Sequence, residues 1–346
     1  MEQALGFQSS KSSLSAIRWK IFRSNKRAFY SLWIFIILFV VSMGAEFIAN
    51  DKPLFIYKDS KFYFPIFVNY PEKVFGGDFD TEPNYNDPYV KELLKNAFVL
   101  HAPIPYSYDT IVMDLNSPAP TSPDKKHWLG TDDQARDVGA RLIYGYRISI
   151  LFGFILSIFS VFIGVSAGAL QGYCGGSIDL FGQRFIEIWS GVPILFLLIV
   201  ISSFLAPSFW WILTLVLIFS WMGLSSVVRA EFLRGRNMDY VKASRALGAS
   251  DLRIIFYHIL PNALVATITY IPFIMAGSIA TLVSLDFLGF GMPVGSASLG
   301  ELLNQGKNNL SSPHLAVTGF LSVSLLLSVL VFIGEGVRDA FDSNVK

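Results

Sequence analysis

The chain has 346 residues, of which 53% are hydrophobic and only 15% are charged. Soluble domains usually have about 25% charged residues, and a chain this apolar would expose large adhesive patches in water, so we expect a membrane protein. A net charge of +1 argues against a strongly basic nucleic-acid-binding protein, and the single cysteine, Cys174, excludes an internal disulfide and any site with several cysteine ligands.

Six apolar runs are long enough to cross a bilayer, which takes about 20 residues of helix. They cover residues 29–48, 148–170, 188–206, 209–228, 263–285 and 315–334. The first run is too long for the apolar region of a signal peptide, so we expect it to be a retained anchor. As buried helices of a soluble protein, six such runs would need a far larger polar shell than this chain supplies. The predicted fold class is therefore an all-α integral membrane protein with six transmembrane helices.

The Lys and Arg residues in the short loops predict the orientation of these spans. The N-terminal segment 1–28 carries Lys11, Arg18, Lys20, Arg23, Lys26 and Arg27, and the loop 229–262 carries Arg229, Arg234, Arg236, Lys242, Arg245 and Arg253. The loop after the fifth span carries only Lys307. We therefore expect 1–28, 229–262 and the C-terminal tail 337–346 in the cytoplasm, and 49–147 outside.

The segment between the first two spans is rich in aromatic residues and proline. Such a composition rarely stays disordered, so we expect residues 49–127 to form a small, irregular, partly β cap. The cap could dock an extracytoplasmic partner or act as a passive lid. After it, Thr131 as N-cap and Asp132 and Asp133 in the first turn predict an interfacial helix within 131–147. Capping is preferred to metal binding or acid–base catalysis for these acids, because no third ligand is evident beside them.

Residues 229–262 predict two short helices joined by a turn. Residues 240–247 are helix-like, Gly248 suits a helix C-cap, Ser250 can cap a second helix, and Pro261 restricts the chain before the fifth span. An apolar stripe at helical spacing follows the turn: Leu252, Ile255, Phe256 and Ile259. We reject a DNA-binding helix-turn-helix because the two helices lie between two membrane spans. The remaining alternatives are a docking site for a soluble partner and a simple connector between spans.

Three further features concern packing and charge. Gly164, Gly168 and Gly172 repeat at helical spacing and predict close packing, within this chain or against a partner subunit. Pro272 and Gly277 interrupt the fifth span and favour either a bend that opens a pore or a static kink. Asp286 and Glu301 are interpreted as solvated loop charges rather than as contacts for a positively charged amino group.

The run YVKASRALGASDLRIIFYHILPN resembles the EAA loop of ABC importer permeases. Ala243, Gly248, Leu260 and Pro261 match that pattern, whereas Lys242 replaces its Glu and Ser244 replaces its second Ala, departures that are similar to the peptide-importer branch. The resemblance extends over nearly the whole chain. The runs that carry it are WLGTDDQARDVGARLIYGYRIS, GGSIDLFGQRFIEIWSGVPILFLL and LDFLGFGMPVGSASLGELL, and ANDKPLFIYKDSKFYFPIF looks like the Yej type of permease.

This resemblance implies a type I ABC importer permease fold with an irregular extracytoplasmic insertion between helices 1 and 2. It implies the membrane-spanning permease subunit of an ATP-driven importer in the bacterial inner membrane. Yej-type importers take up oligopeptides and the peptide-nucleotide antibiotic microcin C. The implied partners are a second, different permease, an ABC ATPase with two nucleotide-binding domains and a periplasmic peptide-binding protein.

The resemblance also implies that Lys242, Ala243, Ser244, Gly248, Leu260 and Pro261 belong to the loop that couples the permease to its ATPase. The chain lacks the Gly-x-x-x-x-Gly-Lys-Ser/Thr signature, so we expect a transport subunit that is not itself an enzyme and has no cofactor or metal. The alternative within transport is a proton-coupled carrier, which usually places acids or histidines within its spans. An intramembrane enzyme would need a nucleophile–base pair or metal ligands at membrane depth.

Overall fold

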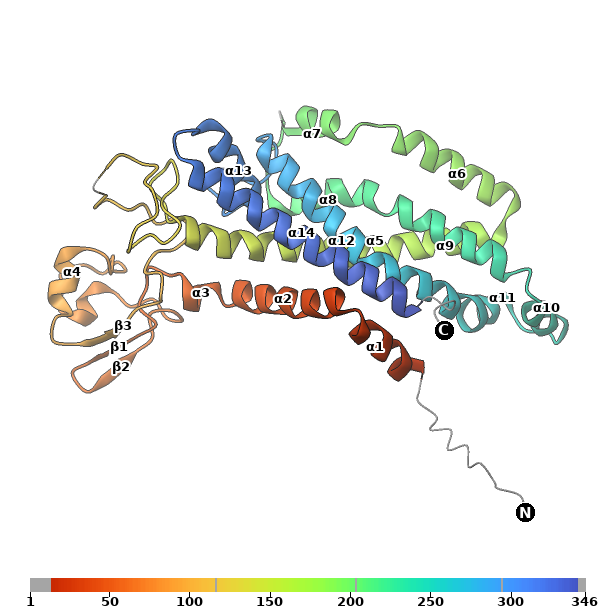
Figure 1. Ribbon diagram of the computed structural model, residues 1–346, viewed down its shortest axis with the longest axis horizontal. Coiled ribbons are helices and arrows are strands. Elements are labelled where there is room, and N and C mark those ends of the chain that lie inside the picture. Colours follow the sequence, from red (N-terminus) through yellow and green to blue (C-terminus); the bar gives the residue numbers. More distant parts are fainter. Residues whose placement is uncertain (1–13, 116, 203, 294, 342–346) are drawn as a thin grey trace, which may run out of the picture.

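The computed structural model describes residues 14–115, 117–202, 204–293 and 295–341 (Figure 1). Lys11 and the end of the predicted tail 337–346 therefore lie outside the described residues. Long helices run side by side along the molecule, with a small β-sheet at one end and α10 at the other (Figure 1). The two ends of the bundle therefore carry different structures.

The helices have the following bounds: α1 Leu14–Ser24, α2 Lys26–Met43, α3 Ala45–Ile48, α4 Pro88–Leu93, α5 Val138–Cys174, α6 Gly176–Ser190, α7 Ile194–Ser202, α8 Phe209–Ser220, α9 Met222–Gly235, α10 Asp239–Ala246, α11 Asp251–Arg253, α12 Leu260–Phe287, α13 Leu299–Asn308 and α14 Pro313–Phe341. The strands are β1 Phe55–Lys58, β2 Lys61–Tyr63 and β3 Phe98–Leu100.

Five helical stretches in the described residues are long and apolar enough to cross a membrane. They are Lys26–Met43, Val138–Cys174, Phe209–Gly235, Asp251–Phe287 and Pro313–Phe341. Their positions agree with five of the six predicted spans, which confirms the all-α membrane class. Only 17% of the apolar window of α2 is buried, so α2 lies at the edge of the bundle.

The third predicted span is not a straight helix over 188–206. The structure has α6 and α7 instead, bent by 65° across the break between Ser190 and Ile194. Pro193 lies in this break, and a proline ring has no N–H to donate to the preceding turn of helix. Together, α6 and α7 make a sixth candidate span only if the bent pair is counted as a single membrane crossing.

The centre of the bundle is packed from α5, α12 and α14. Ile150 of α5, Ile279 of α12 and Leu326 of α14 are each 0% exposed and belong to one apolar cluster. Side chains of α2 and α13 cover this cluster from outside. Apolar burial here fixes the three helices relative to one another, which positions the structures at both ends.

The predicted cap, between α3 and α5, contains a three-stranded antiparallel sheet in the order β2-β1-β3. Ile56 at its centre lies opposite Tyr63 on one side and Val99 on the other. Its side chain is fully buried against a cluster that includes Phe75 and Val90. Ion pairing between Arg147 of α5 and Glu46 of α3, at 2.6 Å, ties the base of this segment to the bundle.

Candidate functional site

The turn between α10 and α11 is closed at Gly248. Its φ is +82°, a left-handed conformation that glycine adopts with little strain. The N–H of Gly248 donates to the carbonyl of Arg245 at 3.0 Å, and the N–H of Ala249 donates to the carbonyl of Ser244 at 3.1 Å. These two bonds form a Schellman motif, which ends α10 and turns the chain into α11. A Cβ at Gly248 would meet no described atom within 4 Å.

This helical turn, residues 239–261, has a buried side and an exposed side. Val241, Ile254 and Ile259 are at most 1% exposed and pack against Leu224, Val228 and Phe232 of α9. On the other side three large apolar residues are open: Leu247 is 88% exposed, Leu252 68% and Tyr257 77%. The predicted stripe is therefore split, because Ile259 is buried whereas Leu252 and Phe256 are exposed. Exposed apolar groups on a rigidly held turn are typical of a protein interface.

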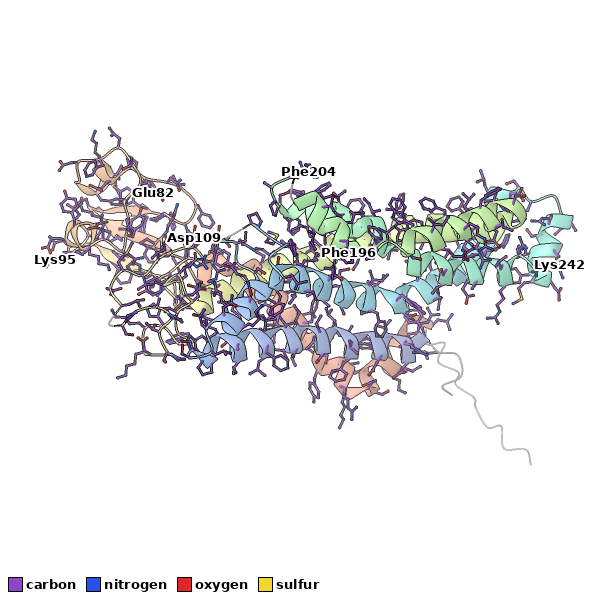
Figure 2. The ribbon with its side chains drawn as sticks, turned by 90° about the horizontal axis from the view of Figure 1, so that it is seen from above. Glu82, Lys95, Asp109, Phe196, Phe204 and Lys242 are labelled. Atoms are coloured by element: carbon purple, nitrogen blue, oxygen red, sulfur yellow. The ribbon has the colours of Figure 1, made fainter. Side chains whose placement is uncertain are left out.

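The other predicted loop residues lie along the same turn. Lys242 and Ala243 are exposed on α10, and Lys242 Nζ lies 3.6 Å from Asp239 Oδ1. Figure 2 shows Lys242 at one end of the molecule and Lys95 at the opposite end. Ser244 Oγ lies 3.1 Å from His258 Nε2, which joins α10 to the chain after the turn.

A π-helical turn, Ile254–Ile259, leads into α12, which begins at the half-buried Leu260. The exposed Pro261 lies in the first turn of α12 and cannot donate a hydrogen bond to the carbonyl of Tyr257. A wide π turn directly before the proline accommodates this missing bond.

The end of α5 holds the turn from the side. The hydroxyl of Tyr173 donates to a carboxylate oxygen of Asp251 and accepts a hydrogen bond from Arg245 Nη2 at 3.0 Å. The hydrogen bond with Tyr173 raises the pKa of Arg245 above its ordinary value. Arg236, between α9 and α10, donates to the carbonyl of Tyr173 at 3.2 Å. The position of the turn is therefore tied to both α5 and α9.

The three small residues of α5 face α9 of the same chain. A Cβ on Gly164 would lie 2.9 Å from the carbonyl oxygen of Trp221, and one on Gly168 would lie 2.5 Å from that of Ser225. A Cβ on Gly172 would lie 2.6 Å from the carbonyl oxygen of Arg229. Since real Cβ contacts are not this short, α5 and α9 approach each other at a distance that only glycine allows. Because α9 leads directly into α10, this contact also fixes the position at which the helical turn, residues 239–261, begins.

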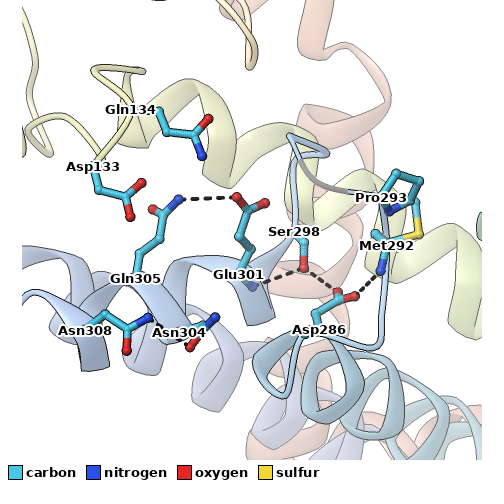
Figure 3. A pocket seen from close by; sticks show the side chains of 11 residues that line it. Asp133, Gln134, Asp286, Met292, Pro293, Ser298, Glu301, Asn304, Gln305 and Asn308 are labelled. Carbon is cyan, nitrogen blue, oxygen red and sulfur yellow. Dashed lines mark hydrogen bonds between the residues drawn. The ribbon is translucent and has the colours of Figure 1, made fainter. Parts of the chain in front are cut away.

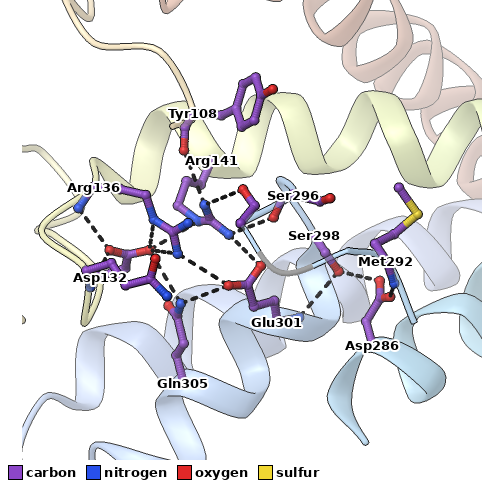
Figure 4. Close-up of polar contacts among 12 residues, drawn as sticks. Tyr108, Asp132, Arg136, Arg141, Asp286, Met292, Ser296, Ser298, Glu301 and Gln305 are labelled. Carbon is purple, nitrogen blue, oxygen red and sulfur yellow. Dashed lines mark hydrogen bonds and ion pairs between the residues drawn. The ribbon is translucent and has the colours of Figure 1, made fainter. Parts of the chain in front are cut away.

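A buried polar cluster lies at the opposite end of the bundle (Figure 4). Asp132, fully buried, accepts from Arg136 Nε at 2.7 Å and lies 3.3 Å from Arg141 Nε. Arg141, also fully buried, donates to Glu301 of α13 at 2.7 Å, and Arg136 donates to the same carboxylate at 3.3 Å. Gln305 Nε2 donates to Glu301 at 3.3 Å. Two carboxylates and two guanidinium groups thus join the 131–137 loop, α5 and α13.

The prediction of a separate interfacial helix within 131–147 is wrong. The helix begins at Val138 and continues without interruption into the long α5. Its N-cap is Asp137, whose side chain accepts from the N–H of Ala140 at 2.9 Å, not Thr131. Asp132 forms buried ion pairs with arginines rather than capping a helix. Arg136 and Arg141 follow Asp132 by four and nine residues and precede an apolar span, which was a usable signal, because charges close to a span are usually paired.

The interpretation of Asp286 and Glu301 as solvated loop charges is also wrong. Asp286 is 7% exposed, and its carboxylate accepts from the Ser298 hydroxyl and from the N–H of Met292 at 2.6 Å. Both acids line a cavity of about 230 Å³ between the 131–137 loop, the end of α12 and α13 (Figure 3). The arginine partners of Glu301 are more than 100 residues away, and the partners of Asp286 lie between α12 and α13, so local sequence gave no sign of them.

A second cavity, of about 310 Å³, opens between α7, α8 and α12. Gly277, Ser278 and Thr281 of α12 line it, opposite Ile194 of α7 and Val216 of α8. Pro272 lies five residues before Gly277 on α12, which remains one helix from Leu260 to Phe287. The cavity therefore presents a small-residue face of α12 at the depth of the spans.

The chain matches two family models. Residues 160–346 match the binding-protein-dependent transport system inner membrane component, and residues 13–65 match the N-terminal TM domain of oligopeptide transport permease C. Together these matches include the glycine face, the helical turn and Glu301.

Individual proteins are similar over most of their length. The inner membrane ABC transporter permease protein YejE of Escherichia coli K12 is 56% identical over 96% of this chain and 98% of its own. The peptidoglycan transport system permease protein YejE of Agrobacterium fabrum is 50% identical over 94% and 92%. The oligopeptide transport system permease protein OppC of Haemophilus influenzae is 34% identical over 71% and 79%.

Among solved structures, the MetNI methionine ABC transporter aligns with 58% of this chain and 96% of its own, at 17% identity and a TM-score of 0.49. The sequence matches confirm the resemblance to Yej-type permeases, and with it the type I importer permease fold.

Proposed function

This chain belongs to the family of inner-membrane components of binding-protein-dependent transport systems, and we propose that residues 239–261 couple it to an ABC ATPase. The observation that carries the proposal is the exposed apolar side of the turn, with Leu247, Leu252 and Tyr257, at the end of the bundle opposite the cap. The buried side is packed on α9, so a push on the turn would be transmitted to the spans.

Co-purification tests this proposal. We expect the affinity-tagged chain, extracted from bacterial membranes in mild detergent, to bring down an ATP-hydrolysing subunit. Leu252→Ser should reduce that recovery, because it removes an apolar side chain from the exposed side of the turn. Phe62→Ser on the cap is the matched control, since Phe62 is 64% exposed and Leu252 68%. Recovery of no ATPase with the unmodified chain would contradict the proposal.

The energy source separates an ATP-driven importer from a proton-coupled carrier. In reconstituted vesicles, uptake should require ATP on the side of the ATPase and should continue when a protonophore collapses the proton gradient. Uptake that needs the gradient and proceeds without ATP would identify a proton-coupled carrier instead.

We extend the proposal to the substrate and the remaining partners. Relatives named as oligopeptide, dipeptide and peptidoglycan transport permeases support peptides as the substrate class, and the Yej-type resemblance adds microcin C-like peptide-nucleotides. The cavity beside α12 supports a path formed together with a second, different permease. A periplasmic peptide-binding protein would deliver the substrate at the cap end.

The orientation of the termini is a further part of the proposal. Reporter fusions at residue 20, residue 245 and the C-terminus should report the cytoplasm, and a fusion near residue 90 should report the outside. The physical reason is the excess of Lys and Arg in 1–28 and 229–262. An external signal at residue 245 would place the helical turn out of reach of a cytoplasmic ATPase and would contradict the coupling proposal.

A further inference from the structure

An apolar groove lies between α1, the start of α2 and the end of α14. It has a volume of about 360 Å³, and its lining includes Trp19 and Phe22 of α1, Leu32 of α2, and Ile333 and Val337 of α14. Trp19 stacks on Phe22 at a ring separation of 5.7 Å, yet remains 52% exposed. The groove is therefore a preformed, open apolar site.

The helix beside this groove is strongly basic. Residues 14–27 contain five cations and no acid: Arg18, Lys20, Arg23, Lys26 and Arg27. Among the described residues, none of these five forms an ion pair within 4.0 Å. Arg18 lies at the groove itself, with its guanidinium carbon 4.3 Å from the ring centre of Phe341. The acids on the adjoining end of α14 are Glu335 and Asp339, and Asp339 accepts from Asn25 at 3.1 Å.

The groove lies where two membrane spans end. Leu32 is in the second turn of α2, and residues 333–341 are the last turns of α14. Figure 1 shows α1 set at an angle to α2, at the end of the bundle away from the cap. Such a helix, apolar on one side and rich in Lys and Arg, is suited to the interface between headgroups and acyl chains.

We propose that α1 and the end of α14 bind an anionic phospholipid, with an acyl chain in the groove and the phosphate near Arg18. The apolar lining suits the acyl chain, and the five cations of residues 14–27, without an ion-pair partner among the described residues, suit an anionic headgroup rather than a zwitterionic one. This lipid site does not depend on the transport function. Its test can fail while the coupling proposal holds, and the coupling proposal can fail while the lipid site is confirmed.

Tryptophan quenching tests the site directly. The full chain, with any subunits that purify with it, is titrated in detergent with phosphatidylglycerol brominated on its acyl chains. A parallel titration uses brominated phosphatidylcholine. The signal of Trp19 is the difference between the unmodified protein and Trp19→Phe. We expect phosphatidylglycerol to quench Trp19 at lower concentration than phosphatidylcholine.

Charge variants test the headgroup contact. In Arg18→Gln/Lys20→Gln/Arg23→Gln, the phosphatidylglycerol concentration for half-quenching should rise about fivefold for each cation that contributes. The control Lys73→Gln/Lys95→Gln/Lys126→Gln removes three exposed charges from the cap and should leave the concentration for half-quenching unchanged. Equal quenching by both lipids, or an unchanged preference in the α1 variant, would overturn the proposal. Quenching of Trp19 that occurs only after residues 1–13 are removed would also overturn the proposal, since the groove would then be filled by this chain. Absence of Trp19 quenching by either lipid would overturn it as well.

Discussion

Gly248→Asp is expected to abolish peptide uptake while the chain still reaches the membrane in normal amount. Asp tolerates a left-handed φ better than most residues, so the strain at +82° should stay at or below about 1–2 kcal/mol. A Cβ there has free space within the described chain, so the fold should accommodate it. The added charge would instead be placed in the proposed contact with the ATPase, next to the exposed Leu247.

The measurements are the stimulation of ATP hydrolysis by peptide-loaded binding protein and the uptake of a toxic peptide by cells. Both should be lost in Gly248→Asp. Gly76→Asp is a matched control, because Gly76 has a φ of +91° and equally free space but lies in the cap. Full stimulation and uptake in Gly248→Asp would show that the turn is not the coupling element.

Gly168→Leu is expected to prevent stable accumulation of the chain. Even a Cβ would lie 2.5 Å from the Ser225 carbonyl and 2.8 Å from the Val228 Cβ, so α9 would have to move. Overpacking typically costs about 1–3 kcal/mol, and a contact with backbone relaxes poorly. Because the glycine face meets α9 of the same chain, we expect the defect to arise within this chain before any second permease is bound.

The amount of protein in the membrane and its melting temperature in detergent measure this effect. Gly223→Leu is the control, because Gly223 lies on α9 itself and a Cβ there meets nothing within 4 Å. A Gly168→Leu chain that accumulates and melts like the unmodified protein would mean that α5 and α9 do not pack closely in the membrane.

Hydrophobicity predicted most of the fold because the bilayer demands long apolar helices. It failed at the third span, where Pro193 breaks an apolar run that composition alone shows as continuous. The helical turn was predictable because its signals are local: a glycine between two helix patterns and a proline before the next span.

The contacts between the polar cluster and α13 were not predictable from local sequence, because they join distant parts of the chain. Arg141 and Glu301 are 160 residues apart, and no periodicity shows that they meet. Asp286 shows the same limit, since its burial depends on the fold of the loop that carries Ser298. The glycine repeat predicted a close helix contact but did not identify the partner helix. Close packing of α5 against α9 or against a second permease would require the same small residues.

The most direct test of the coupling proposal is site-specific photo-cross-linking from Leu247 in the assembled transporter. Leu247 and Met113 are both 88% exposed, the first on the helical turn and the second in the cap, so they form a matched pair. A photoreactive residue at position 247 should cross-link to the ATPase, and one at position 113 should not. Absence of an ATPase cross-link from position 247 in a complex that hydrolyses ATP and takes up peptide would contradict the proposed role of residues 239–261.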